Sequence, residues 1–592
     1  MSPINFPDFS CPVYKPGDFD YDGYCYQYAT TSEPMPMSPA AIICPQYPNA
    51  DSDVKKAIQY AYNNNVSIAV RTGGHAYSGT SSTSAPNMQL DLSKAYNDWE
   101  DNGDGTFTMG ISFSLAEFNT KLRASGHFMP TGQCYNVHLG GHVQTGGYGQ
   151  LSRAFGLFSD HVESFEIYLA PKKQGEEPTK RTVKRGEELF FAVLGGGPGN
   201  YGIMTHITIR PLKDSDYPDA RAYKHIIPYN PELDHNVLVD LFNLVKEWEN
   251  APSGYDFSIT VASAEGNFLA NQLGLASAED FLVTFFGGKN SSPPFDVILV
   301  YFQYSNTDKS TQYDPSWCQK IKTILQKANT SGPICERIKM FEEQIILDLM
   351  IKQQDDKPVP ISTSITEFWT YQGTREFNYP YIKNGQVTDS IASEDWAEWA
   401  AGRIDEMVGR SDEGLMVFVQ CQNFGGAGSV YPNGWKNNAK NTSYAWRKTT
   451  VGYNLDVFYD PETSGAFQKA NDWQNENIKW NVGANGKFSV ENHRWFWASH
   501  GDLNMKNVWQ YYYDSRDVYD TCRNVKNSVD SNGVFTPNSF VVGYDLNILD
   551  DSIPAHSRLE IKFNDAEMTE HHTETAKQRA KEKGVNLDNF FR

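Results

Sequence analysis

Cysteine, positive charge and long apolar runs are all scarce in this chain. Eight cysteines among 592 residues exclude a scaffold built on disulfides. Acidic residues outnumber basic ones by 72 to 51, and the net charge of -21 disfavours nucleic acid and anionic lipid as partners. No apolar run approaches the roughly 18 to 20 residues that cross a bilayer. We therefore expect a small polar or neutral molecule as the partner, with no nucleic acid, no membrane and no metal site.

The order of predicted helices and strands changes near residue 213. Residues 53–63 have helical spacing and lead into a short apolar strand at 67–71, and a further strand at 204–210 closes this first part. Longer helices, such as 236–250, then alternate with strands such as 295–302 and 415–420. The pattern predicts an α+β protein with a nucleotide-type domain, followed by a second domain in which an antiparallel sheet is flanked by helices.

Two glycine-rich turns each carry a nucleophilic side chain. The first reads Arg71-Thr-Gly-Gly-His75-Ala-Tyr77-Ser-Gly79, and the second runs from Gly132 through Cys134 to Gly149. Clustered glycines let backbone N–H groups approach a diphosphate closely. A third stretch, from Gly197 to Gly202, fits the dinucleotide fingerprint G-x-G-x-x-G, but here a helix precedes and a strand follows, the reverse of the order that binds NAD. We assign its glycines to the same cofactor loop.

The turns, together with the stretches 194–203, 512–514, 525–526 and 530–537 in that order, resemble the berberine-bridge-enzyme-like branch of the vanillyl-alcohol-oxidase superfamily. Among its members, the motifs are most similar to those of hexose and oligosaccharide oxidases. The resemblance implies FAD held by two covalent bonds, from His75 to the flavin 8α-methyl group and from Cys134 to C6. The cofactor-binding residues it predicts are Arg71, Thr72, Gly73, Gly74, His75, Gly79, Cys134, Val137, Gly140, Gly141, His142, Gly146, Gly147, Gly149, Gly202 and Ile203.

The same resemblance implies a domain order. Residues 1–38 would be an N-terminal segment, and 39–212 together with a C-terminal return at 496–543 would form a two-part PCMH-type FAD-binding domain. The substrate-binding domain, 213–495, would be inserted between these two parts, and 544–592 would be a C-terminal extension containing a charged helix at 573–583.

Reaction with O2 can be predicted by the same comparison. In this family a small residue three positions after the flavin-linked cysteine accompanies use of O2, and a bulkier one accompanies dehydrogenase activity. That position holds Val137, and the histidine usual in oxidases corresponds to His142. Ordinary packing is the alternative explanation for Val137. The resemblance therefore favours an oxidase.

Oxidation of an alcohol by a flavin also needs a base within hydrogen-bond reach of the hydroxyl group. Sugar oxidases of this family use a tyrosine supported by an aspartate, but here His500 and Gln422 stand at those positions. We predict His500 as the base, oriented by Asp502, with Tyr77 over the active face. The predicted substrate-binding residues are Gln420, Gln422, Tyr453 and Asn454, each with a packing or surface role as the alternative.

These residues predict a bicovalent FAD-dependent oxidase that converts the anomeric hydroxyl of a carbohydrate to a lactone and reduces O2 to hydrogen peroxide. One alternative is a berberine-bridge-like oxidase of a secondary-metabolite alcohol or amine, because one cofactor domain serves different substrates. An alternative from another class is a flavin-holding binding protein with little turnover, which the missing tyrosine and aspartate favour.

Signals for cellular location disagree. Four sequons, at Asn65, Asn290, Asn329 and Asn441, would accept glycans in a secretory pathway. The first eight residues lack the basic and apolar stretches of a signal peptide. We give the sequons more weight and expect a secreted glycoprotein.

Overall fold

The computed structural model describes residues 6–25, 38–76, 80–195, 197–264, 295–309, 312–329, 356–365, 381–388, 395–459, 463–481, 488, 509, 513–538 and 540–543. Within these ranges, no helix combines the length and the apolar character that a membrane crossing requires.

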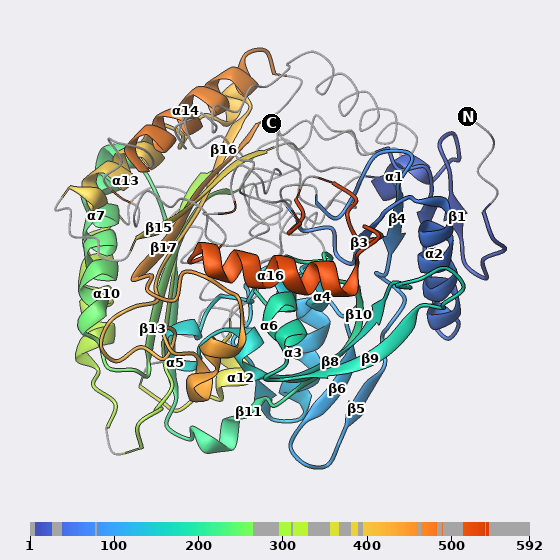
Figure 1. Cartoon of the computed structure of the whole chain (residues 1–592). Helices are drawn as coiled ribbons and strands as arrows, with labels where there is room; N and C mark the ends of the chain where they lie inside the picture. The colour runs from blue at the N-terminus through green and yellow to red at the C-terminus, as the bar shows by residue number, and fades with distance from the viewer. Residues whose placement is uncertain are drawn as a thin grey trace.

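Residues 6–213, which we call the first half of the chain, form sheets of four, five and two strands with helices around them (Figure 1). The four-stranded sheet has the order β1-β2-β4-β3, made of Val13–Tyr14, Ile42–Ile43, Met88–Asp91 and Ile68–Arg71. The five-stranded sheet has the order β5-β6-β10-β8-β9, made of Trp99–Asp101, Phe107–Gly110, Ile203–Ile209, Val162–Leu169 and Thr179–Lys184. The helices are α1 (Tyr21–Cys25), α2 (Ala50–Asn64), α3 (Leu115–Ala124), α4 (Leu139–Gln144), α5 (Ser152–Phe155) and α6 (Glu188–Val193), and β7 (His127–Phe128) pairs with β11 (Leu212–Lys213).

Local sequence explains where these helices begin. Ser114 caps α3 by accepting the backbone N–H of Glu117, and the Glu117 carboxylate accepts the N–H of Ser114 in return. This capping box satisfies two donors that a helix start leaves open. Apolar residues of α2 such as Val54 and Ile58 lie on one face and are fully buried in the first core. The observed bounds of α2, β3 and β10 lie within a few residues of those predicted.

Residues 221–488, which we call the second half of the chain, are built on one antiparallel six-stranded sheet with the order β12-β14-β13-β16-β17-β15. Its strands are Arg221–Pro228, Phe295–Tyr304, Tyr255–Ala264, Leu415–Asn423, Val451–Tyr459 and Tyr381–Thr388 in that order. Helices α7 (Pro231–Glu247), α10 (Ser316–Leu325), α13 (Trp396–Asp405) and α14 (Ala466–Asn481) lie along one side of this sheet, and the first half of the chain lies on the other (Figure 1). A short helix, α12, covers Ile361–Ser364.

Side chains alternate across this sheet because successive strand residues point to opposite faces. Val419 and Cys421 of β16 belong to the core beneath the four helices. Gln420 and Gln422, between and beside them, face the first half of the chain and bond to it. The face turned toward the first half is thus lined with amides and is suited to a polar site.

A C-terminal helix, α16 (Arg516–Val529), returns to the first half of the chain. Its N-cap Ser515 accepts the N–H of Val518, and its buried side Tyr519, Cys522 and Val525 joins the first core. The buried Lys526 ammonium bonds to Asp530 at 2.6 Å and to the carbonyl oxygens of Asn200 and Phe535. Residues far apart in sequence therefore share one core.

The predicted α+β fold class is confirmed: one core is formed by two separate parts of the chain, and an antiparallel sheet with helices is inserted between them. The first core combines residues between Ile43 and Ile209 with residues between Tyr513 and Val542, and the second core lies between Tyr223 and Phe488. The exact domain boundaries stay a prediction. The predicted helix at 573–583 lies outside the described residues.

Candidate cofactor and substrate site

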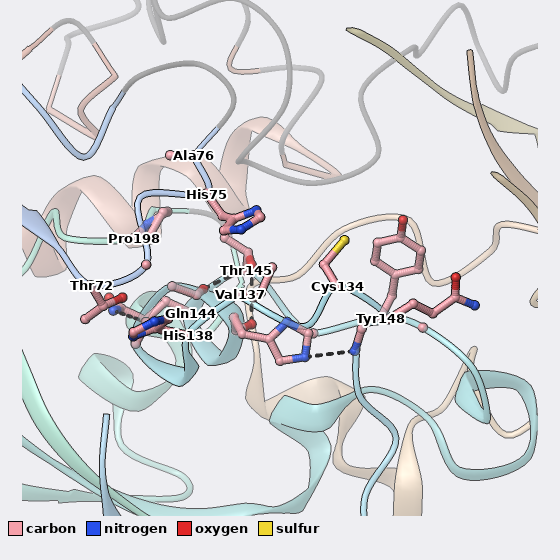
Figure 2. Close-up of a pocket in the computed structure, with 18 of the residues that line it drawn as sticks. Thr72, His75, Ala76, Cys134, Val137, His138, Gln144, Thr145, Tyr148 and Pro198 are labelled. Atoms are coloured by element: carbon pink, nitrogen blue, oxygen red, sulfur yellow. Dashed lines mark hydrogen bonds between the residues drawn. The ribbon is translucent and has the colours of Figure 1, made fainter. Parts of the chain in front are cut away.

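One pocket lies where the two glycine-rich turns meet the polar face of the six-stranded sheet. Figure 2 shows His75 arriving from the first turn and Cys134 and Tyr148 from the second, with all three side chains extending to the same side of the pocket. The sheet contributes residues of β13, β16 and β17 as the opposite wall. The pocket therefore combines two nucleophilic side chains with a wall of amides.

The first turn follows directly from strand β3. Val70 and Thr72 line the pocket, whereas the Arg71 guanidinium lies on the other side of the strand. There Arg71 pairs with Asp91 at 3.5 Å and donates to the carbonyl oxygen of Tyr24. Arg71 was predicted among the cofactor residues, but the structure gives its side chain a buried contact in the four-stranded sheet instead.

The second turn needs its glycines because other parts of the protein press against them. A Cβ on Gly149 would lie 1.9 Å from the Thr131 carbonyl oxygen, and one on Gly140 would lie 2.8 Å from the Thr72 methyl carbon. Gly147 has a φ of +72°, which disfavours any residue with a side chain. Gly141 differs, because nothing lies within 4 Å of the position its Cβ would take. At Gly141 the backbone is bare toward the pocket.

His142 lies beneath the second turn as a buried hydrogen-bond acceptor. Its Nε2 accepts the N–H of Gly132 at 3.2 Å, and its ring packs edge-on against Phe158. Burial lowers the pKa of His142 to about 3, so the ring is neutral at ordinary pH with its proton on Nδ1. It holds the Gly132 backbone just before Cys134.

A third loop, after α6, reaches the pocket through Pro198, Gly199 and Gly202. The side-chain oxygen of Gln144 accepts the N–H of Gly199 at 3.2 Å, and its amide nitrogen donates to the Gly140 carbonyl. Gln144 thus joins two glycine loops. The loop lies between helix α6 and strand β10, which is the order that argued against an NAD site.

Amides of the sheet connect it to the second turn. Gln420 donates to the Gln133 side chain at 2.7 Å, beside Cys134, and Gln422 donates to the Gly149 carbonyl at 2.8 Å. Each bond uses one of an amide's several hydrogen-bonding positions. These contacts fix the distance between the sheet wall and the Cys134 turn.

The two predicted residues of β17 lie on different faces of the sheet. Asn454 is buried, and its amide donates to the Asp456 carboxylate at 3.3 Å. The Tyr453 ring packs edge-on against Trp396, in the core beneath the helices. Strand alternation therefore points the Tyr453 ring away from the side of the sheet where Gln420 and Asn454 lie.

Sixteen of the predicted site residues line this pocket. They are Thr72, Gly73, Gly74, His75, Cys134, Val137, Gly140, Gly141, His142, Gly147, Gly149, Gly202, Gln420, Gln422, Tyr453 and Asn454. Arg71, Gly146 and Ile203 are described but do not line it: Gly146 lies against Tyr444, and Ile203 belongs to the first core. Tyr77, Gly79, His500 and Asp502 lie outside the described residues.

Several polar lining residues were not predicted from the sequence, among them Gln133, His138, Gln144, Tyr148 and Ser258. The Tyr148 ring packs edge-on against Phe424, and burial, followed by the nearby Cys134 and Asp456, raises its pKa well above the ordinary value. Its phenol therefore stays protonated and can donate a hydrogen bond. Its place between Gly147 and Gly149 in a loop already assigned to the cofactor could have suggested it.

The pocket fits a dinucleotide flavin. The bare backbone at Gly141 allows the close approach that a diphosphate needs, and His75 and Cys134 open into the same space. In the described ranges, no group of three or more histidine, cysteine or acidic residues could hold a metal ion.

Comparison with known proteins assigns a class to the part of the chain that contains the two glycine-rich turns. A family model described as an FAD-binding domain matches residues 39–172. Berberine bridge enzyme-like 12 of Arabidopsis thaliana is 34% identical over 189 residues, which are 31% of this chain and 33% of that protein. The match to this curated relative thus spans about a third of its length.

Solved structures extend the likeness over the whole fold. The wild-type berberine-bridge-enzyme-like protein 1 of Physcomitrella patens has a TM-score of 0.62 at 17% identity, covering 90% of this chain and 98% of that one. A xylooligosaccharide oxidase from Myceliophthora thermophila has a TM-score of 0.58 at 18% identity, with 90% and 97% covered. Residues 39–172 thus match an FAD-binding domain and are similar in sequence to berberine-bridge-enzyme-like proteins, and the chain as a whole shares the fold of these solved structures.

Proposed function

We propose that this protein is an FAD-dependent oxidase that carries its flavin in this pocket, bonded to both His75 and Cys134. The observation that carries the proposal is that the two nucleophilic side chains come from separate glycine turns yet line one pocket. When bound, FAD accepts a hydride from the substrate carbon. The division into residues 1–38, 39–212, 213–495, 496–543 and 544–592 is part of the same proposal.

The chain's own residues would bind and orient the substrate. Gln420, Gln422 and Asn454 offer amide groups, and Tyr148 offers a phenol that stays protonated. His500, with Asp502, remains our proposal for the base that takes the hydroxyl proton, with Tyr77 on the active face. Val137 lines the pocket close to Cys134 in sequence, as a position that controls access of O2 requires.

A carbohydrate is the substrate class that we propose, oxidised at its anomeric carbon to a lactone while O2 becomes hydrogen peroxide. The wall formed by Ser258, Gln420, Gln422 and Asn454 presents hydroxyl and amide groups, which suit a ring with several hydroxyls. Structural neighbours include chitooligosaccharide and xylooligosaccharide oxidases, but also berberine bridge enzyme and 6-hydroxy-D-nicotine oxidase. The alternative substrate, a secondary-metabolite alcohol or amine, therefore occurs on the same fold.

Covalent attachment is tested by acid precipitation of the purified protein. We expect the flavin colour to stay with the wild-type chain, and His75→Ala and Cys134→Ala each to keep one bond with an altered absorption spectrum. The double variant should release all its flavin into the supernatant. Wild-type protein that releases its flavin on precipitation would contradict the two-bond proposal.

The substrate class is tested by peroxide release from a panel of oligosaccharides and a panel of aromatic alcohols and amines. Peroxide with sugars alone supports the carbohydrate proposal, whereas peroxide with the aromatic panel alone supports the alternative. The third alternative, a flavin-holding protein with little turnover, predicts that no compound bleaches the flavin under anaerobic conditions.

Secretion with glycosylation is the location that we propose. The Asn65 side chain is exposed at the end of α2, and Asn329 and Asn441 are partly exposed, while Asn290 lies outside the described residues. Mass spectrometry of protein from its native source, before and after glycosidase treatment, tests this proposal.

A further inference from the structure

The part of the pocket that the structure describes lacks the charged side chains that a phosphorylated cofactor usually meets. Among its described lining residues there is no lysine, arginine, aspartate or glutamate. FAD would nevertheless bring a negatively charged diphosphate into it. Backbone N–H groups of the glycine turns can bind such a group, but side-chain donors to phosphate normally add to them.

Three of the described lining residues are histidines, and two of these have other roles. His75 is the proposed attachment residue. His142 uses Nε2 to accept the Gly132 N–H, and burial lowers its pKa to about 3, so it adds no positive charge. His138 is the third.

His138 lies where the two glycine turns touch. Its Cδ2 atom is 2.7 Å from the position that a Cβ on Gly73 would take, so its ring lies directly against the first turn. Figure 2 shows His138 and Thr72 at the end of the pocket away from Cys134 and Tyr148. If the flavin ring is bonded to His75 and Cys134, the nucleotide half of FAD would extend away from Cys134.

The backbone around His138 is fixed by hydrogen bonds, and its ring lies against Gly73. His138 forms an isolated bridge with Ser114, and its carbonyl accepts the N–H of His142. The N–H of the next residue, Leu139, donates to the Phe113 carbonyl at 3.0 Å. A ring held this firmly loses little freedom when it binds a ligand.

We propose that His138 donates a hydrogen bond from its imidazole to the diphosphate of FAD and is the side chain by which this pocket recognises the nucleotide half of the cofactor. The inference rests on the proposed placement of FAD. It assigns to His138 a binding role that neither glycine turn can supply through its backbone alone.

The test uses the full chain produced without flavin in a riboflavin-starved host. The initial rate of flavin incorporation, measured over a range of FAD concentrations, gives a half-saturating concentration for each variant. His138→Phe keeps a ring against Gly73 but has no donor, and we expect it to raise that concentration about tenfold or more. His138→Asn and His138→Gln place an amide nitrogen near Nδ1 or Nε2, and we expect at least one of them to recover most of the loss.

The control is His127→Phe, because His127 lies in β7 and does not line the pocket. Thermal unfolding of each flavin-free variant shows whether it folds. A folded His138→Phe that incorporates FAD like the wild type, or amide variants that lose as much as His138→Phe, would overturn the inference and leave the ring as a spacer. Wild-type protein that takes up no FAD would instead overturn the proposed function.

Discussion

Gly141 and Gly149 belong to one glycine-rich segment but meet opposite surroundings. Gly149 lies so close to Thr131 that a methyl group there would overlap its carbonyl oxygen, at 1.9 Å. Gly141 has no neighbour within 4 Å of the same position, and it lines the pocket. One glycine is needed for the protein to fold, and we infer that the other is needed for the cofactor to approach.

The two alanine variants should therefore fail in different ways. Gly149→Ala forces the backbone apart, and we expect it to lower the free energy of unfolding by about 2 kcal/mol or more. Gly141→Ala should unfold like the wild type before flavin is added, but should take up much less FAD. Thermal unfolding and flavin absorbance separate these effects. A Gly141→Ala protein that loads flavin normally would argue against a close cofactor approach at this residue.

At the residue scale, the glycine motifs carried most of the information in the sequence. They predicted residues on both turns that the structure brings into one pocket, because the close approach of two backbones leaves few choices but glycine. Arg71 shows the limit. It follows the pocket residue Val70 directly, and in a strand that adjacency places its side chain on the opposite face. Gln144 carried no comparable pattern.

At the scale of elements, helix α5 joins the two halves through one buried arginine. The Arg153 guanidinium donates to the carbonyl oxygens of Ala251, Pro252, Tyr255 and Gly425, all in the second half of the chain. The backbone N–H of Arg153 donates to the buried Asp256 carboxylate at 3.1 Å. Burial raises the pKa of Asp256 to about 7, although the positive charge of Arg153 opposes that shift.

Replacing Arg153 should lower the free energy of unfolding more than replacing an exposed arginine. Arg153→Met leaves several carbonyl oxygens unsatisfied in a dry interior, and we expect a loss of about 3 kcal/mol or more in the free energy of unfolding. The control is Arg181→Met, whose ion pair with Glu187 lies at the surface and should contribute less than about 1 kcal/mol. Equal losses in urea unfolding for both variants would contradict the assignment of Arg153 as an interdomain contact.

The segment after β16 shows why element roles were harder to predict than elements. Residues 422–443 are rich in glycine and asparagine, a composition typical of an exposed polar loop. In the structure the segment packs against the first half: Arg447 pairs with the buried Asp160 at 2.7 Å, and the Ser443 N–H donates to the Leu194 carbonyl. Periodicity predicted the strand before this segment, at 415–420, but a contact between residues 287 positions apart, such as Asp160 and Arg447, leaves no local pattern in the sequence.

At the scale of the whole molecule, buried histidines tie stability to pH. Burial lowers the pKa of His142 to about 3 and the pKa values of His161 and His225 to about 4. Each takes up a proton more readily in the unfolded chain, so each makes the folded state less stable as pH falls below about 6.5. His206 and His235 act in the opposite direction: burial lowers their pKa values, but hydrogen bonds to neighbouring carboxylates outweigh it and raise them.

A variant at His161 measures the contribution of one histidine to this pH dependence. Glutamine is the replacement, because its side-chain amide can also donate a hydrogen bond to the Phe155 carbonyl. Its Nε2 donates to the Phe155 carbonyl at 3.0 Å, and the ring stacks on Trp435. Between pH 7 and pH 5, the wild type should lose about 2 kcal/mol more stability than His161→Gln, since only the wild type gains a proton at this position on unfolding. Urea unfolding at the two pH values measures the difference, and His127→Gln, a partly exposed histidine, is the control. If His161→Gln loses as much stability as the wild type, His161 is not the neutral buried group inferred here, and the acid sensitivity must come from His142, His225 or the carboxylates.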